Sequence, residues 1–222
     1  MSTDRLPDIS DANQGPWIAL PLFPLQTVLF PGGLLQLKVF EARYLDLISD
    51  CLRSQTPFAV VRIRQGGELR GSSSGSGSSS QKTLLDDIGV LAHLQDVDAE
   101  QPGILRARCV GGQRVHLGAR HQRGDGLWLA EAAIAEAEAA AAVPAELAGA
   151  AQALRQAIES LKAQDQHPFL PPFQLNDAGW VANRWCEILP ISGAAKQRLL
   201  ALDEPLLRLK LVQDYLQAKG LV

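Results

Sequence analysis

Ser192 and Lys196 are the residues of this chain whose types and spacing come nearest to a catalytic pair. They lie four positions apart, about one helical turn, and a lysine beside a serine can act as the base for a serine nucleophile. Such a nucleophile also needs an oxyanion hole, which no neighbouring pattern indicates. Serine is favoured at the first position of a helix, so we interpret Ser192 as a helix cap. We therefore expect no catalytic residue and no enzymatic activity.

Metal ligands are present as residue types but not at the spacing that metal sites use. The four histidines are far apart: His93, His116, His121 and His167. The acidic run Asp96-x-Asp98-x-Glu100 is similar to the start of a calcium-binding loop, but Gln101 stands where that loop requires glycine. The three cysteines are also widely separated: Cys51, Cys109 and Cys186. We expect buried, reduced thiols, no metal and no cofactor.

A basic segment is the strongest candidate binding feature. Residues 102–124 contain no acidic residue and five arginines: Arg106, Arg108, Arg114, Arg120 and Arg123. The preceding residues 86–100 contain five carboxylates and no lysine or arginine. Because alternate residues of a strand share a face, we favour cross-strand charge pairing on a solvated sheet face. The alternative is an RNA-binding strip made by Arg106, Arg108 and Arg114, although the shortage of aromatic residues there weighs against it.

Composition describes an ordinary globular chain. Its 222 residues are 46% hydrophobic, enough for one large domain or two small ones. The net charge of -3 gives no global attraction to nucleic acid or anionic lipid. The N-terminus lacks the basic-then-apolar order of a signal peptide. Residues 17–37 carry no charge, but Pro21, Pro24 and Pro31 would break a membrane helix. We expect a cytoplasmic protein.

The first part of the chain is predicted to be a β domain over residues 17–135, after a flexible tail over 1–16. Apolar alternation, β-branched runs and turn residues predict strands over 17–22, 26–30, 34–40, 58–64, 88–95, 104–110, 113–117 and 127–134. The first of these, between prolines, suits an edge strand, and Gly111-Gly112 is expected to end the strand before it. One early helix is expected over 41–53. A Ser/Gly-rich stretch over 66–80 is expected to be a mobile loop.

The second part is predicted to be a helical domain over residues 144–220. Leucine and isoleucine recur at helical spacing after Pro144, and a later stripe places Arg184 on the same face as Trp180 and Trp185. Asn176 is expected to cap that second helix. Ser192 is expected to start a third helix, and the last helix is expected to bury an apolar stripe: Leu206, Leu209, Val212, Tyr215 and Leu216. The predicted fold class is α+β.

Two motifs are similar to one protein family. The stretch Phe23-Pro24-Leu25 to Phe40-Glu41-Ala42-Arg43-Tyr44 and the later run from Trp185 to Arg208 resemble the N-terminal substrate-binding domain of the ATP-dependent Lon proteases. The resemblance implies a PUA-like β pseudo-barrel with one early helix, followed by an α-helical bundle. We expect a structural role for the motif residues: Pro24, Phe30, Pro31, Gly32, Phe40, Glu41, Arg43 and Tyr44.

In full Lon proteases a motor domain and a Ser/Lys protease domain follow this module. The present chain ends at Val222 and contains no G-x-x-x-x-G-K-[ST] loop for nucleotide phosphates. The resemblance therefore implies a non-catalytic module that works in proteolysis and binds unfolded or apolar polypeptide segments or a partner protein. We expect neither a nucleic acid nor a membrane partner. The sequence leaves the oligomeric state open, a weak homodimer included.

Overall fold

The computed structural model describes residues 14–65 and 83–222. Along the chain the elements are β1 (Gln14–Leu25), β2 (Leu34–Val39), α1 (Ala42–Ser54), β3 (Phe58–Gln65), β4 (Leu84–Gln101), β5 (Ile104–Gln122), β6 (Trp128–Ala135), the 3₁₀ helix η2 (Ala145–Leu147), α2 (Ala148–Ala163), α3 (Ala178–Ile188), α4 (Gly193–Leu200) and α5 (Pro205–Ala218). The predicted Ser/Gly loop over 66–80 lies outside the described residues, as does the predicted tail up to residue 13. Residues 14–16, the rest of the predicted tail, belong to β1.

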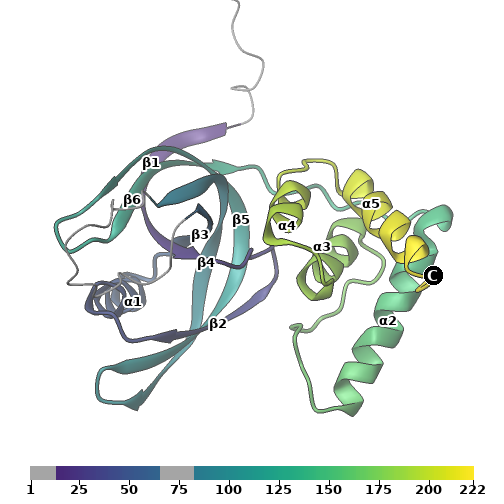
Figure 1. The fold of residues 1–222 in the computed structure, drawn as a ribbon, viewed down its shortest axis with the longest axis horizontal. Helices are drawn as coiled ribbons and strands as arrows, with labels where there is room; N and C mark the ends of the chain where they lie inside the picture. Colours follow the sequence, from purple (N-terminus) through teal and green to yellow (C-terminus); the bar gives the residue numbers. More distant parts are fainter. Residues whose placement is uncertain (1–13, 66–82) are drawn as a thin grey trace, which may run out of the picture.

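The six strands form one sheet that closes on itself. Their order is β2-β5-β4-β3-β1-β6, and β6 also pairs with β5. Every pairing is antiparallel except that of β1 with β3. The ring is not an even barrel, because β2 pairs with the first part of β5 and β6 with the second part. Figure 1 shows this β half at one end of the molecule and the helices α2 to α5 at the other. The predicted α+β class is thus confirmed.

Two strand predictions at the N-terminus were wrong. β1 is an interior strand, flanked by β3 and β6, rather than an edge strand. Its Pro21 is tolerated on the β3 side because the parallel pairing with β3 begins only at Leu22. Residues 26–30 form no strand, although Val28, Leu29 and Phe30 are buried. They enter the core as a loop that ends in a turn, where the Gly33 N–H donates to the Phe30 carbonyl at 2.9 Å.

β5 runs through Gly111 and Gly112 instead of ending there. Gly111 accepts a hydrogen bond from the Gly32 N–H at 2.7 Å and donates one to the Gly33 carbonyl at 2.8 Å. A Cβ on Gly111 would overlap the Phe30 carbonyl oxygen, so no other residue could approach this turn as closely. The glycine pair therefore marks a close contact between β5 and the turn at residues 31–33. A turn at Pro102 and Gly103 joins β4 to β5.

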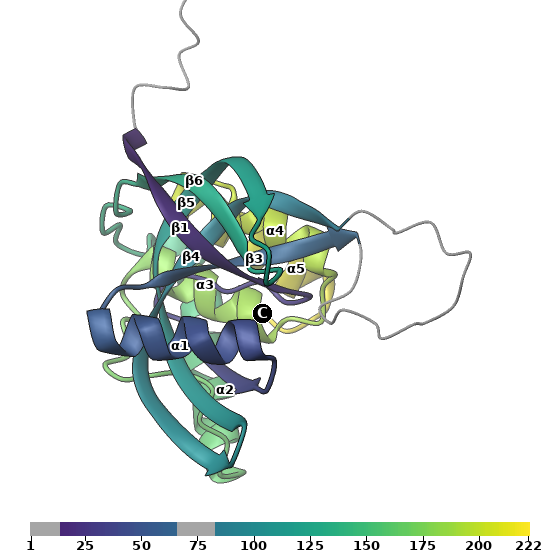
Figure 2. The same cartoon turned by 90° about the vertical axis from the view of Figure 1, so that its left-hand side faces the viewer.

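The Lon-like motif residues around α1 tie this helix to the ring. The Arg43 guanidinium donates to the Gly126 carbonyl at 2.9 Å and pairs with Glu41 at 2.6 Å. Glu41 can reach it because it precedes the helix with an extended backbone. Tyr44 stacks on Phe23 with ring centroids 4.2 Å apart. These contacts hold α1 against the β half. Figure 2 shows the helix lying across that half.

The helical half follows the predicted order with two differences. Asp177 rather than Asn176 caps α3, because its carboxylate accepts from the Trp180 N–H at 2.7 Å. On α5, Leu206 is 41% exposed, whereas Leu209, Val212 and Leu216 are buried as expected. One hydrophobic cluster contains residues of both halves, Phe30 and Val39 among them on the β side and Val181 and Leu209 on the helical side. The halves thus share a core. The three cysteines are buried and free.

Candidate functional site

Three buried arginines join the helical half to the β half. Arg184 of α3 is 1% exposed, Arg208 of α5 is fully buried, and Arg114 of β5 is 7% exposed. Buried charges of this kind need partners, since an unpaired buried cation is strongly unfavourable. Each of the three donates to backbone carbonyls and pairs with a carboxylate, so together they determine how the halves meet.

Arg184 links α3 to the turn before β2. Its guanidinium donates to the Gly32 carbonyl at 2.6 Å and to the Pro31 carbonyl at 2.8 Å, and it pairs with Glu187 at 2.6 Å. The same group lies over the ring of Trp180 at 5.6 Å. Arg184 therefore fixes the turn at residues 31–33 against the helices.

Arg114 and Arg208 converge on Glu138, in the segment between β6 and η2. Arg208 donates to both carboxylate oxygens of Glu138, at 2.5 and 3.0 Å, and to the Asn183 side-chain oxygen at 3.0 Å. Arg114 lies 3.7 Å from Glu138 and pairs with Asp203 at 2.9 Å. This network anchors the connecting segment to both halves.

Glu187 has a perturbed pKa beside this junction. Burial raises the pKa of its carboxyl to about 7, while the charge of Arg184 acts in the opposite direction. Burial also lowers the pKa of Lys196, whose ammonium donates to the Glu187 carbonyl at 2.8 Å. The Lys196 ammonium thus links α4 to α3, whereas the Glu187 carboxyl is engaged with Arg184 within α3.

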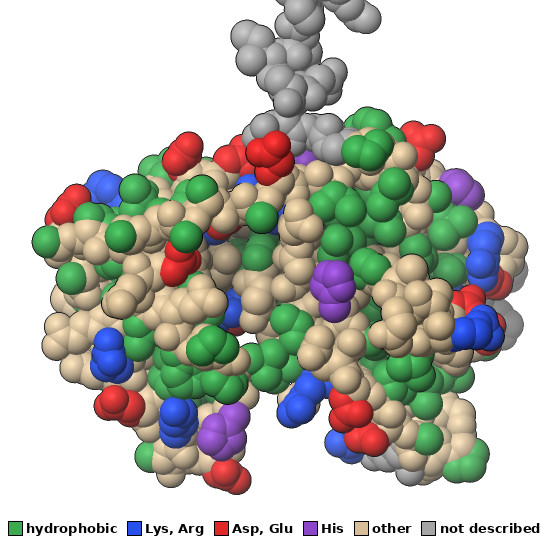
Figure 3. Space-filling model, turned by 180° about the vertical axis from the view of Figure 1, so that it is seen from behind, with side chains coloured by type: hydrophobic (Ala, Val, Ile, Leu, Met, Phe, Trp, Pro, Cys, Tyr) green, Lys and Arg blue, Asp and Glu red, His purple; other side chains and the backbone are tan. Residues whose placement is uncertain are grey.

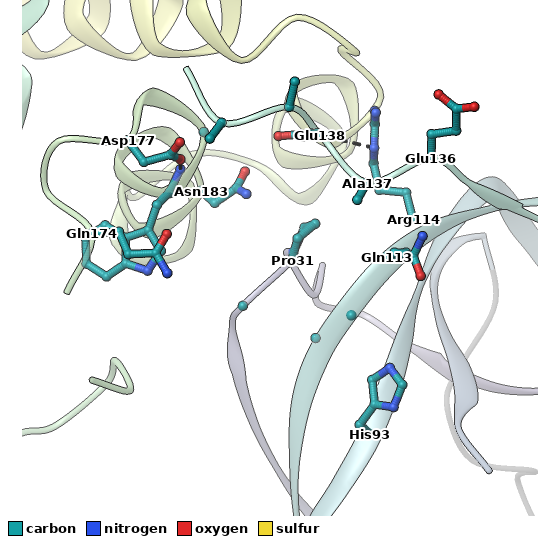
Figure 4. A pocket seen from close by; sticks show the side chains of 17 residues that line it. Pro31, His93, Gln113, Arg114, Glu136, Ala137, Glu138, Gln174, Asp177 and Asn183 are labelled. Atoms are coloured by element: carbon teal, nitrogen blue, oxygen red, sulfur yellow. Dashed lines mark hydrogen bonds and ion pairs between the residues drawn. The ribbon is translucent and has the colours of Figure 1, made fainter. Parts of the chain in front are cut away.

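A cleft of about 440 Å³ opens where the two halves meet. Figure 3 shows the molecule hollowed between its halves, and Figure 4 shows the cleft from close by. Asp177, Asn183 and Gln174 line the helical side, and Pro31, Gln113 and His93 lie across the cavity from them. The connecting segment over residues 136–140 completes the lining.

The polar groups of the cleft are amides, paired charges, and the exposed Glu136 carboxylate and His93 ring. Asp177 is occupied by the Trp180 and Ala141 N–H groups, and Glu138 by arginines. The Gln113 amide donates to the Ala135 carbonyl at 3.0 Å, which leaves its side-chain oxygen without a hydrogen bond to any described residue. The Trp180 ring supplies an apolar wall. Amides and an aromatic ring suit a ligand that is itself made of amides and apolar groups.

The backbone beside the cleft has hydrogen-bonding groups that no described residue uses. β6 ends at Ala135, and the next pairing is the bridge between Ala142 and Asp177. Within residues 14–65 and 83–222, no hydrogen bond reaches the backbone N–H and C=O groups of residues 136–140. The predicted domain bounds left this segment between the two domains, but the sequence did not reveal the cleft because its other walls come from distant segments.

The structure separates the three arginines of the proposed RNA strip. Arg106 and Arg108 lie on the exposed face of the long β4–β5 hairpin, opposite Asp98 and Asp96 in the strand register, as cross-strand charge pairing requires. Together with residues of β2 they border a separate cavity of about 500 Å³. Arg114 is buried against the helices instead, so it does not share a surface with them.

The candidate catalytic and metal-binding residues have structural surroundings. Ser192 caps α4 by accepting from the Ala195 N–H at 3.1 Å, as predicted. No group of three or more possible metal ligands comes together in the described part of the chain. Within the same residues, no helix combines the length and the apolar character needed to cross a membrane.

Comparison with known proteins places this geometry in a family. The family model described as the ATP-dependent protease La (LON) substrate-binding domain matches residues 19–218. A Lon N-terminal domain protein from Xanthomonas campestris is similar in structure, with a TM-score of 0.71, 29% identity, and coverage of 89% of this chain and 98% of that one. The N-terminal domain of Mycobacterium avium complex Lon protease has the same fold, with a TM-score of 0.62, 18% identity, and coverage of 89% and 97%. No curated protein matches the chain. On the match over residues 19–218, this chain belongs to the LON substrate-binding domain family.

Proposed function

We propose that this protein is a non-catalytic module that binds unfolded polypeptide segments in the cleft between its halves. The observation that carries the proposal is the cleft itself: about 440 Å³ of space, walled by amide side chains, the Trp180 ring and backbone groups without partners. This volume lies within the range of about 300–1,000 Å³ typical of ligand sites. Family membership supports it, because the family is described as substrate-binding.

The candidate catalytic pair and two acidic residues of the cleft are engaged in structural contacts, which supports binding rather than catalysis. Ser192 is used as a helix cap and Lys196 donates to a backbone carbonyl of the neighbouring helix. Glu138 and Asp177 hold the walls in place through the hydrogen bonds described above. Such preformed walls lower the cost of ordering the site when a ligand enters.

A titration of the full chain with short fluorescent unfolded peptides tests the proposal. We expect saturable binding, seen as a rise in fluorescence anisotropy. Ala137 is exposed and lines the cleft, so Ala137→Trp should fill the space and weaken binding. Ala163 is exposed at the end of α2, away from the cleft, and Ala163→Trp is the matched control. Absence of saturable binding up to high micromolar peptide, or equal binding by Ala137→Trp and wild type, would reject the proposal.

RNA binding stays a prediction for Arg106 and Arg108 alone, because Arg114 is buried against the helices. Labelled single-stranded RNA in the same titration checks it, because phosphate contacts release counterions and affinity should fall steeply with salt. Arg106→Ala and Arg108→Ala together would then abolish the signal. An RNA affinity that does not change with salt would contradict this alternative.

A further inference from the structure

Residues 136–140 form an irregular, largely exposed segment whose backbone groups have no hydrogen-bond partner in the described part of the chain. The segment continues from the end of β6 and contains no turn or bend before the bridge at Ala142. Backbone N–H and C=O groups are strong hydrogen-bonding groups, and those of this largely exposed segment are open to a partner chain. An unpaired row of them is a ready template for another extended chain.

The segment over residues 136–140 is held in place at its start, in its middle and at its end. The Ala135 carbonyl accepts from the Gln113 amide at 3.0 Å. Glu138 is fixed by Arg208 and Arg114, both buried. The Ala141 N–H donates to the Asp177 carboxylate at 3.1 Å. Because the segment is anchored without using its own intervening backbone groups, an incoming chain meets a preorganised partner.

The side chains of the segment leave its backbone accessible. Ala137, Ala139 and Ala140 are exposed, and all three line the cleft. Their methyl groups leave open the space that longer side chains would fill. Trp180 and Pro31 also line the cleft, where they offer apolar surface to alternate side chains of a bound strand.

We infer that an extended polypeptide segment binds by adding a strand to residues 136–140. This inference rests on the proposed function and names the conformation and the chemistry that the cleft recognises. Main-chain hydrogen bonds are common to all sequences, so the site accepts many sequences, provided that the segment is extended and has free N–H groups. Folded or helical segments, whose backbone groups are already used, are excluded.

Two modified peptides of one sequence test strand addition on the wild-type chain. N-methylation removes a backbone N–H donor, and successive N–H groups of an extended chain point to opposite edges. One probe is N-methylated at every position and the other only at alternate positions, which leaves the N–H groups of one edge free. We expect the fully methylated probe to bind at least about tenfold more weakly, the factor that corresponds to losing a few net hydrogen bonds. The half-methylated probe should bind like the unmodified peptide.

A pair of protein variants applies the same logic to the chain itself. Ala139→Pro and Ala140→Pro each remove one N–H, and the two point to opposite edges. We expect one variant to lose at least about tenfold in affinity and the other to retain it, with thermal unfolding of both checking the fold. If both methylated probes bind as tightly as the unmodified peptide, strand addition is overturned while the proposed function stands. If the unmodified peptide does not bind, the proposed function itself fails.

Discussion

Replacing Arg184 by methionine should weaken the junction between the two halves more than any exposed substitution. Methionine keeps an unbranched chain against Trp180 but removes three interactions of the guanidinium: those with the carbonyls of Pro31 and Gly32 and with the Glu187 carboxylate. Removing one partner of a buried ion pair typically costs about 3–5 kcal/mol. Since domains are stable by about 5–15 kcal/mol, the variant should fold with much of its stability lost.

Urea unfolding followed by tryptophan fluorescence measures this loss. The double variant Arg184→Met with Glu187→Gln should recover about 1–2 kcal/mol, because no buried carboxylate is then left unpaired. Arg108→Met is the matched control, since Arg108 is exposed on β5, and it should change stability by less than about 0.5 kcal/mol. An Arg184→Met variant within about 1 kcal/mol of wild type would refute the assignment of Arg184 to the junction.

Three further predictions concern local features of the fold. Because the pKa of Glu187 is raised from 4.5 to about 7, its stabilising contribution is present below about pH 4.5 and is lost as pH rises through 7. The free energy of unfolding of wild type in urea should therefore fall, relative to that of Glu187→Gln, by at most about 3 kcal/mol towards pH 8. Parallel pH curves for the two proteins would contradict this. Gly111→Ala should destabilise by about 1–3 kcal/mol in thermal unfolding, because its Cβ would overlap the Phe30 carbonyl, and an unchanged midpoint would show that the turn can move. Asp177→Ala should cost about 1–2 kcal/mol while Asn176→Ala costs little, and the reverse order would assign the cap to Asn176.

Local patterns predicted most elements of the β half. The alternation of residues 34–40 placed Leu37 and Val39 on the buried face of β2, where the structure has them. The continuation of β5 through Gly111 was not predicted, because glycine pairs usually end strands. The turn at residues 31–33, which Gly111 contacts closely, lies far away in the sequence. Residues 26–30 show the same limit: their apolar character predicted burial correctly but not the irregular backbone.

The site was less predictable than the fold. The stripe on α3 placed Arg184 among buried residues, which was a usable signal, but its carbonyl partners belong to a turn far from it in the sequence. The predicted domain bounds left residues 136–143 as a connection between the halves. Only the structure shows that the backbone groups of residues 136–140 lack partners in the described chain and face a cleft. The family motif itself, including Tyr44, supplies the scaffold.

Hydrogen exchange measured by NMR, with and without unfolded peptide, tests the central claim most directly. The N–H groups of residues 136–140 have no hydrogen-bond partner in the described chain, so they should exchange quickly in the free protein. Saturating peptide should slow exchange at alternate residues of this segment and leave Arg106 and Arg108 unchanged. Unchanged exchange over residues 136–140, with protection confined to the β4–β5 hairpin, would contradict binding in the cleft.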